Sequence, residues 1–408
     1  MERPYAKAVI SPKAERSLRG GHPWVFADEV RGISRAYENG EIVDVYTEKD
    51  RFLGSGFIND NSKIRIRLVS RNANDRFDEN FWRRRVKYAV DYRRSVMGDD
   101  FACCRLIFGE ADEMPGLTAD YFGSVIVTET LSLGMEKVKH IVFPALAEAV
   151  RELGHPVDAI YERNDLALRT KEGMARYSGF FPAEGMKTGL DGSCVITENG
   201  VEYAVDYING QKTGFFLDQK YNRRAIWKIA KGRRVLDCFT HTGAFALNAA
   251  MAGAEHVTAV DVSQDAIDMA RGNAVRNRLD GAMDFVCRDV FELLTEMAQS
   301  GKSCGYDFII LDPPAFTKSS ATVKSAYRGY KEINMKAMRL LPRGGYLATC
   351  SCSHFMTDEL FRRMLHDAAA DACVSLRQIE ARQQSPDHPI LWNVPETDYL
   401  KFYIFQVV

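Results

Sequence analysis

The sequence predicts a mixed α/β protein. A mostly parallel, doubly wound sheet fills the second half of the chain, after a small β-rich domain and a central α/β region. From about residue 195, apolar strand-like runs alternate with helical segments, which is typical of a parallel sheet with helices on both faces. Nearer the start, residues 41–46 and 63–69 alternate apolar and polar side chains between glycines, as half-buried strands do.

The length of 408 residues accommodates several domains, and we place them at 1–72, 73–190 and 191–408. The middle domain combines helical patterns at 79–96 and 136–153 with strand-like runs at 124–130 and 159–162. In the last domain we expect strands at 234–238, 256–262, 284–288, 306–311, 345–351 and 399–408, with helices at 244–251 and 265–276.

Bulk features exclude several classes of protein. No segment approaches the roughly 20 apolar residues of a membrane span, and the start lacks an apolar leader. We therefore expect a cytoplasmic protein with no membrane partner. The nine cysteines contain no matched CxxC pairs, so we expect no metal site and mostly reduced core thiols.

Three aspartates close the first three expected strands of the last domain: Asp237, Asp261 and Asp289. Ligands of doubly wound sheets bind at the carboxyl ends of the strands. Asp261 follows Asp237 by about 24 residues, close to the usual offset of a ribose-binding carboxylate. Together they predict a nucleoside-containing ligand, although each alone could be a helix cap or a surface residue.

The turn after the first strand separates two cofactor classes. It carries Thr242 and a single glycine, Gly243, so the G-x-G-x-x-G fingerprint of a nicotinamide enzyme is absent. S-adenosylmethionine has no phosphate and needs no such cradle. Ser263 is expected to cap the helix that follows the second strand.

Residues 309–316 carry the sharpest motif, Ile-Ile-Leu-Asp-Pro-Pro-Ala-Phe. Asp312 ends a buried strand, and Pro313 and Pro314 stiffen the backbone behind it. This edge can hold a carboxylate and main-chain carbonyls against a planar base, although an Asp-Pro-Pro turn can also be purely structural.

A strand at 345–351 leads into Cys350 and Cys352, which strand alternation would place on one face. A thiolate is the usual nucleophile for addition to a pyrimidine ring. His354 could help carry protons if the strand extended that far. The alternative is a pair of buried strand-end cysteines.

The chain resembles the 23S ribosomal RNA large-subunit methyltransferases of the cytosine-C5 type. The resemblance rests on segments along nearly the whole sequence, at 21–26, 108–117, 198–200, 210–219, 222–223, 237–243, 311–316, 351–353 and 387–389. It implies a PUA domain, a central α/β domain and a Rossmann-like class I methyltransferase domain. It also implies S-adenosyl-L-methionine as cofactor and 23S ribosomal RNA as partner, and leaves a homodimer open.

The resemblance assigns residues to the cofactor. Residues 212–219 would fold over its methionine part, Asp261 would bind the ribose and Asp289 the adenine amine. The full expected set is Phe216, Gln219, Asp237, Phe239, Thr242, Gly243, Asp261, Ser263, Asp289, Val290, Asp312 and Pro313.

The resemblance also implies a mechanism. Cys352 would attack C6 of a cytosine while Asp312 hydrogen-bonds or protonates N3, and C5 would accept the methyl group. Some cytosine-C5 RNA enzymes carry a second cysteine beside the Asp-Pro motif. Here that place is Pro313-Pro314, so the base that removes the C5 proton is unassigned.

Basic residues supply the expected RNA contacts. Between positions 60 and 94 there are 11 Lys/Arg against 5 Asp/Glu, a local excess that could meet phosphates or form a solvated helix face. The expected RNA-binding residues are Lys63, Arg65, Arg67 and Arg71, with Pro314 and Phe316 at the base.

Other functions stay open at this point. A relative of the same architecture could methylate a purine nitrogen, since proline carbonyls can accept from an exocyclic amine. A non-catalytic RNA-binding ribosome-assembly factor could keep the fold without turnover. A small-molecule methyltransferase would leave the first 70 residues without a role.

Overall fold

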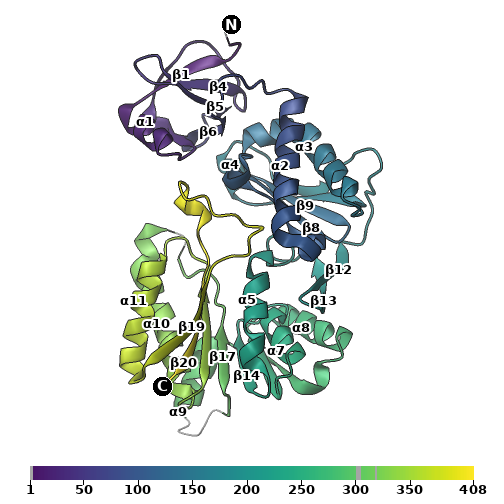
Figure 1. Ribbon diagram of the computed structural model, residues 1–408, viewed down its shortest axis with the longest axis vertical. Helices are drawn as coiled ribbons and strands as arrows, with labels where there is room; N and C mark the ends of the chain where they lie inside the picture. The colour runs from purple at the N-terminus through teal and green to yellow at the C-terminus, as the bar shows by residue number, and fades with distance from the viewer. Residues whose placement is uncertain (1–2, 300–304, 318) are drawn as a thin grey trace. The chain divides into compact units, whose positions relative to one another are not determined.

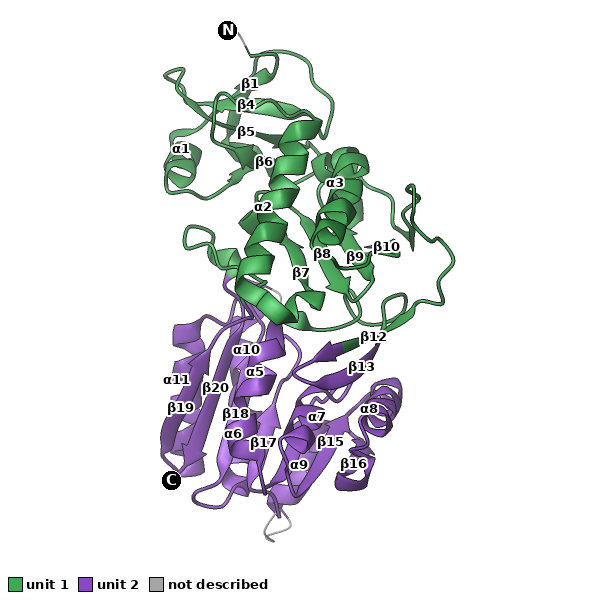
Figure 2. Ribbon diagram, turned by 45° about the vertical axis from the view of Figure 1, so that its right-hand side comes forward, with its two compact units in different colours: residues 1–196, 205–217, 386–397 green, residues 197–204, 218–385, 398–408 purple. Residues whose placement is uncertain are grey.

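The chain folds into two units that are each assembled from separate stretches of sequence (Figure 2). The computed structural model describes residues 3–299, 305–317 and 319–408. Unit 1 comprises residues up to 196 with 205–217 and 386–397, and unit 2 comprises 197–204, 218–385 and 398–408. We expected a domain boundary at 190/191, but the later segments 205–217 and 386–397 also belong to unit 1.

Unit 1 begins with a six-stranded sheet in the order β2-β6-β5-β4-β1-β3. Its elements are β1 (Ala6–Ile10), α1 (Pro12–Arg19), β2 (Trp24–Phe26), β3 (Val30–Ile33), β4 (Ile42–Tyr46), β5 (Phe52–Ile58) and β6 (Ile64–Ser70). Alternate residues of these strands, such as Val25, Val43 and Ile66, form a buried core, as the period-two pattern predicts. Ser11 caps α1 by accepting from the backbone N–H of Ala14.

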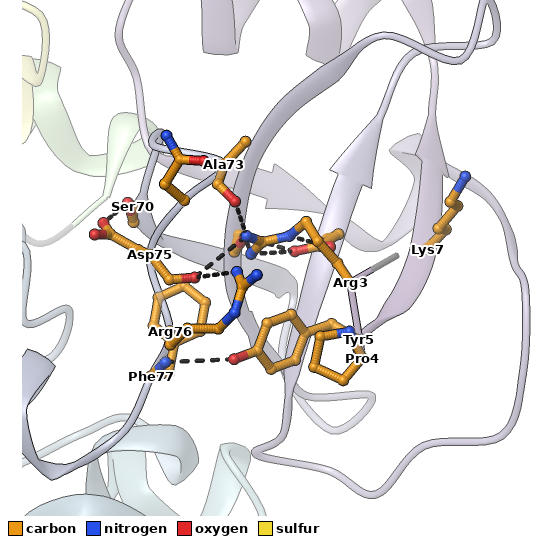
Figure 3. Close-up of polar contacts among 12 residues, drawn as sticks. Arg3, Pro4, Tyr5, Lys7, Ser70, Ala73, Asp75, Arg76 and Phe77 are labelled. Carbon is orange, nitrogen blue, oxygen red and sulfur yellow. Dashed lines mark hydrogen bonds and ion pairs between the residues drawn. The ribbon is translucent and has the colours of Figure 1, made fainter. Parts of the chain in front are cut away.

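Polar contacts tie the first residues to the segment that leaves this sheet (Figure 3). The Arg3 guanidinium donates to the backbone carbonyls of Ala73 and Asp75. The Tyr5 hydroxyl accepts from the Phe77 N–H at 3.3 Å, and their rings pack edge to face. The chain therefore enters the next domain along a fixed path.

A second sheet of unit 1 has the order β11-β10-β9-β8-β7. Its strands are β7 (Cys103–Phe108), β8 (Leu117–Phe122), β9 (Val125–Thr130), β10 (Ala159–Asn164) and β11 (Tyr177–Phe180). The helices α2 (Glu79–Met97) and α3 (Leu133–Glu152) pack on each other and on this sheet, and α4 (Leu168–Lys171) is one short turn. The hairpin of β12 (Ser193–Glu198) and β13 (Val201–Asp206) follows.

Unit 2 is built on a seven-stranded sheet in the order β16-β15-β14-β17-β18-β20-β19 (Figure 1). The strands are β14 (Arg234–Cys238), β15 (His256–Asp261), β16 (Met283–Cys287), β17 (Phe308–Leu311), β18 (Tyr346–Ser351), β19 (Leu376–Arg382) and β20 (Lys401–Val407). The first five are parallel, and β20 runs antiparallel between β18 and β19. The predicted doubly wound, mostly parallel sheet is confirmed.

Helices flank this sheet. α9 (Val290–Gln299), α10 (Val323–Leu340) and α11 (Asp358–Ala372) share one buried core with the strands. α5 (Lys220–Ala225), α6 (Trp227–Ala230), α7 (Ala244–Met251) and α8 (Gln264–Arg276) form a second contacting group. Across the described ranges, no helix is both long and apolar enough to cross a membrane.

Candidate active site

The order of strands in unit 2 reverses between β14 and β17, and both strands end in an aspartate. Asp237 is the fourth residue of β14, and Asp312 follows the last residue of β17. Because the two strands are parallel neighbours with Cys238 opposite Leu311, the two carboxylates meet at one edge. This switch point is where doubly wound sheets bind ligands.

Asp237 stiffens the turn that follows β14. Its Oδ2 accepts from Thr240 Oγ1 at 2.6 Å and from the Ala246 N–H at 2.9 Å. Its Oδ1 is buried without a hydrogen-bond partner in the described part of the chain. Burial raises the pKa of this carboxyl to about 7, and the charges of Asp312 and Asp261 contribute to the rise. The site therefore holds excess negative charge and a spare acceptor.

The turn from 239 to 243 is bent into the left-handed region three times, at Phe239 (φ 66°), His241 (φ 50°) and Gly243 (φ 80°). A Cβ at Gly243 would lie 3.0 Å from the Cβ of Ala270, so only glycine allows this close approach to α8. Non-glycine residues held at positive φ cost free energy and cluster at ligand sites.

Asp261 links this turn to the next strand. Its carboxylate accepts from the N–H of His241 at 2.9 Å and from the N–H of Ser263 at 3.0 Å. Ser263 accepts from the Ala266 N–H and caps α8, as predicted. Burial lowers the pKa of His241 to about 4, so its imidazole is neutral at physiological pH.

Asp289 and Val290 lie after β16. Asp289 Oδ1 accepts from the Glu292 N–H at 3.0 Å at the start of α9, so one oxygen serves as a helix cap. The Val290 side chain is 2% exposed and belongs to the core. The expected role of both toward an adenine stays a prediction.

Asp312 is the centre of a hydrogen-bonded chain. It accepts from Gln219 Nε2 at 3.1 Å, and Gln219 Oε1 accepts from Asn222 at 2.7 Å. Burial raises the pKa of Asp312 to about 6, Asp218 raises it further, and contacts with Cys350 and Gln219 lower it. Gln219 therefore orients a carboxyl that can exchange a proton near neutral pH.

The two cysteines of the motif occupy different environments. Cys350 lies within β18 and is fully buried, and burial raises the pKa of its thiol. β18 ends at Ser351, so Cys352 lies one residue beyond the strand from which alternation was argued, and the strand does not extend to His354. Cys352 is partly exposed in the loop beyond. The described cysteines form no disulfide, and Cys304 lies outside the described residues.

A buried lysine beside this loop went unnoticed in the sequence. Lys401 Nζ donates to the Ser353 carbonyl at 2.6 Å and to the Tyr399 carbonyl at 2.8 Å. Burial lowers the pKa of Lys401 to about 8, and negative charge on Cys352 raises it. A cation therefore contacts the residue that follows Cys352. The sequence signal for it was a single lysine at the start of the apolar run of β20.

The loops after β17 and β18 are tied together. Ser353 Oγ donates to the Thr317 carbonyl at 2.8 Å. The Phe316 ring packs against Tyr330 and Phe291, with centroids 4.4 and 5.8 Å away. Pro313 is buried and Pro314 exposed, so the Asp312 loop has a fixed inner side and an open outer side.

A buried ion pair also escaped sequence reasoning. Arg223 Nη1 donates to Glu198 Oε1 at 2.5 Å, and both side chains are at most 2% exposed. The Arg223 charge lowers the pKa of His241 and of Asp312. The Arg223 charge therefore influences the protonation of two groups of the site.

Phe216, one of the expected cofactor residues, belongs to unit 1. The Lys212 ammonium lies 4.7 Å from the centroid of its ring, and Thr213 Oγ1 donates to the buried Asp120 at 2.5 Å. These contacts fix the start of the segment expected to cover the cofactor.

The expected RNA-binding arginines of β6 bind protein groups instead. Arg67 pairs with Glu110 and Glu172, each at 3.2 Å. Arg65 pairs with Asp60 at 2.7 Å. Arg71, at the end of the strand, donates to backbone carbonyls of residues 18, 21 and 22. These arginines therefore have protein partners and their contact with RNA stays a prediction, as does that of Lys63, whose side chain is exposed.

The described residues fit S-adenosylmethionine. The carboxyls of the buried Asp237 and the partly exposed Asp312, with pKa values raised to about 7 and 6, suit a ligand that carries sulfonium and ammonium charges. Asp237 holds the turn by hydrogen bonds, and the close approach of Gly243 to α8 leaves no side chain at that position of the turn.

Comparisons with known proteins agree with this geometry. Residues 166–405 match the family described as S-adenosylmethionine-dependent methyltransferase, and residues 9–71 match the PUA-like domain. The ribosomal RNA large subunit methyltransferase I of Aeromonas salmonicida is 40% identical over 95% of this chain and 96% of its own. That of Cronobacter sakazakii is 38% identical over 98% and 99%.

Solved structures show the same fold. A SAM-dependent methyltransferase from Streptococcus mutans superimposes with a TM-score of 0.80 at 21% identity, covering 98% of this chain and 100% of its own. A methyltransferase solved in complex with SAH gives 0.81 at 21% identity, with the same coverage. The chain belongs to the family of S-adenosylmethionine-dependent methyltransferases that includes ribosomal RNA large subunit methyltransferase I, with a PUA-like domain at its start.

Proposed function

We propose that this enzyme forms 5-methylcytosine in large-subunit (23S) ribosomal RNA, through a covalent adduct between Cys352 and C6 of the base. The single observation that carries the proposal is the partly exposed thiol of Cys352, in the loop after β18. β18 pairs with β17, the strand that leads to Asp312, and the buried Lys401 contacts the next residue of the loop, Ser353. The curated relatives at 38–40% identity are named as ribosomal RNA large subunit methyltransferases.

Residues around the β14 turn would hold the cofactor. Asp261 would accept hydrogen bonds from the ribose hydroxyls, and Asp237 would add negative charge near the ammonium or sulfonium group. Gly243, which has no side chain, would let the cofactor approach the backbone closely. Phe239, Thr242, Ser263, Asp289 and Val290 complete the expected wall, and Phe216, Gln219 and Pro313 complete the methionine side. Bound S-adenosylmethionine supplies the electrophilic methyl group.

The chain's own groups then activate the base. The Cys352 thiolate adds to C6, and the carboxyl of Asp312 donates to N3, so that electron density moves to C5. After C5 has accepted the methyl group, a base removes the C5 proton and the bond from sulfur to C6 breaks. Pro314 and Phe316 lie beside Asp312 on the loop that would hold the base, and Lys63 and Arg65 remain candidate phosphate contacts.

Replacement of the nucleophile tests this proposal. Cys352→Ala should abolish methyl transfer from labelled cofactor to RNA and leave cofactor affinity unchanged. RNA containing 5-fluorocytosine has no C5 proton to lose, so it should trap wild-type protein covalently and release the variant. Cys350→Ala is the matched control, since that thiol is fully buried. Unchanged methylation by Cys352→Ala would refute the nucleophile.

Methylation of a purine nitrogen is the second candidate. The Asp-Pro-Pro-x-Phe loop favours it, because proline carbonyls can accept from an exocyclic amine. Mass spectrometry of nucleosides from methylated RNA separates the two products. A non-catalytic assembly factor would transfer no label at all.

The finer expectations on location and assembly belong to the same proposal. We place the enzyme in the cytoplasm, where ribosomal RNA is modified in bacteria such as the sources of its relatives. A homodimer stays a prediction that sedimentation of the purified chain would test.

A further inference from the structure

Trp392 is the most exposed large apolar residue of the described chain, with 98% of its surface open. It lies in the segment 386–397 of unit 1, which the catalytic chemistry does not use. An indole left entirely in water forgoes the burial that usually stabilises this side chain. This exposure leads us to look for a ligand that would cover the indole.

The segment around Trp392 is held firmly, so this exposure does not come from a loose loop. Asp387 is buried, accepting from the Arg105 N–H at 2.9 Å through its carboxylate and from Arg93 at 2.9 Å through its carbonyl. On the other side, Thr397 accepts from the Leu391 N–H at 2.9 Å. Trp392 thus occupies a turn that is fixed at both ends.

That turn rests on the PUA-like domain. Asn393 Nδ2 donates to the Gly21 carbonyl at 2.5 Å, and Glu396 contacts His22 at 3.2 Å. Arg71 donates to the same Gly21 carbonyl at 2.9 Å. A cavity of about 270 Å³ lies alongside, lined by Arg71, Asn393 and Val394 among others.

Cationic side chains lie on the element next to this contact, and one of them, Arg19, pairs with Glu15 at 2.8 Å. The last turn of α1, next to Gly20 and Gly21, carries the exposed Arg16 and Arg19. An open aromatic face beside cationic groups is what a single-stranded nucleic acid requires, because the ring stacks on a base while the cations meet phosphates.

A protein partner fits this surface less well. Apart from Trp392, no residue of 386–397 and none of α1 is an exposed large hydrophobic. A stable protein interface buries about 1,200–2,000 Å² with an apolar centre, and one indole among polar neighbours does not provide that.

We propose that Trp392 is a stacking platform for an unpaired base of the RNA substrate, presented beside the cationic end of α1. The inference deepens the proposed function and rests on RNA being the substrate. Trp392 acts as a positioning residue: it holds RNA near the PUA-like domain and takes no part in methyl transfer.

The test is fluorescence anisotropy of the full-length protein with a fluorescein-labelled 15-nucleotide single-stranded RNA of mixed sequence, at fixed salt. Loss of one stacked base predicts about 5- to 100-fold weaker binding for Trp392→Ala and Trp392→Leu. Trp392→Phe, which keeps an aromatic face, should stay within about 3-fold of wild type. In methyl-transfer assays, Trp392→Ala should raise KM for RNA and leave kcat and cofactor affinity unchanged.

Tyr88→Ala is the matched control, because Tyr88 is an exposed aromatic (58%) on α2 of the same unit. Arg16→Ala should weaken binding less than Trp392→Ala and flatten the salt dependence.

Wild-type binding by Trp392→Ala, or full rescue by Trp392→Leu, would overturn the proposal. So would a wild-type dimer in sedimentation that Trp392→Ala converts to monomer, because the indole would then be a contact between protein copies. RNA binding that depends on Trp392 without any methylation would instead sink the proposed function and leave this inference standing.

Discussion

Two polar clusters of this enzyme differ in whether their carboxyls are paired with a cation. At the edge of the unit 2 sheet, burial raises the pKa values of Asp237 and Asp312 to about 7 and 6, and neighbouring carboxylates add to the rise. On β6 of unit 1, the Arg67 guanidinium lies between Glu110 and Glu172, each at 3.2 Å. The first cluster is the one prepared for a cationic ligand, and the Arg67 cluster joins two sheets of unit 1.

Replacement of Asp312, at the edge of the unit 2 sheet, should have the largest effect. Asp312→Asn cannot protonate N3, and general acid–base contributions of this kind are typically 10²–10⁴-fold in rate. We expect methyl transfer from labelled cofactor, measured at saturating cofactor, to fall by about 10³-fold. Asp284→Asn, on the exposed part of β16, is the control and should retain full activity.

The next prediction concerns stability and pH. Burial raises the pKa of Asp237 to about 7 in the folded protein, against about 3.9 in the unfolded chain. The folded state therefore retains a proton that the unfolded state loses, and wild-type stability falls as pH rises from 4 to 7, by up to about 4 kcal/mol. Urea unfolding without cofactor at pH 5 and pH 8 should show this slope, reduced in Asp237→Asn. An equal slope in both proteins would contradict the assignment.

Loss of the guanidinium in the Arg67 cluster should change the stability of the protein. Arg67 is 12% exposed, and its loss leaves two partly buried carboxylates without their cation, which costs about 3 kcal/mol. We expect Arg67→Ala to lower the free energy of unfolding of unit 1 by that amount, measured by urea unfolding. Lys63→Ala, on an exposed neighbour, should change it by less than about 0.5 kcal/mol.

The smallest expected effect is on the methylation rate, after replacement of Lys401. Lys401→Met removes the cation that contacts Ser353, the residue after Cys352, and leaves a side chain of similar length. A less favoured thiolate should lower the methylation rate by about 10-fold at pH 7, with the deficit shrinking at higher pH. A rate deficit that does not vary with pH would indicate a structural role for Lys401.

Sequence patterns predicted what depends on neighbours along the chain. The strand at 234–238 and the helix at 244–251 match the structure residue for residue, because periodicity and glycine punctuation are local. Asp237, Asp261 and Asp312 come together because parallel strands end at one edge. Their roles toward the cofactor stay predictions.

Features that depend on distant partners could not be predicted. Nothing near Arg67 signals that Glu172, more than one hundred positions later, neutralises it. Lys401 reaches the Ser353 carbonyl across the β18–β20 pair, and Arg223 meets Glu198 out of sight of any motif. β18 ends at Ser351, one residue before Cys352, and the apolar pattern alone could not reveal this boundary.

The interleaving of the two units has a consequence for biosynthesis. Unit 1 is completed by residues 386–397, and β20 settles between β18 and β19 only after them. A nascent chain therefore cannot finish unit 1 before residues 386–397 have been made, nor unit 2 before residues 398–408. A product that ends before residue 386 would lack β20 in its unit 2 sheet and the last segment of unit 1. Quality-control proteases would degrade such incompletely folded products.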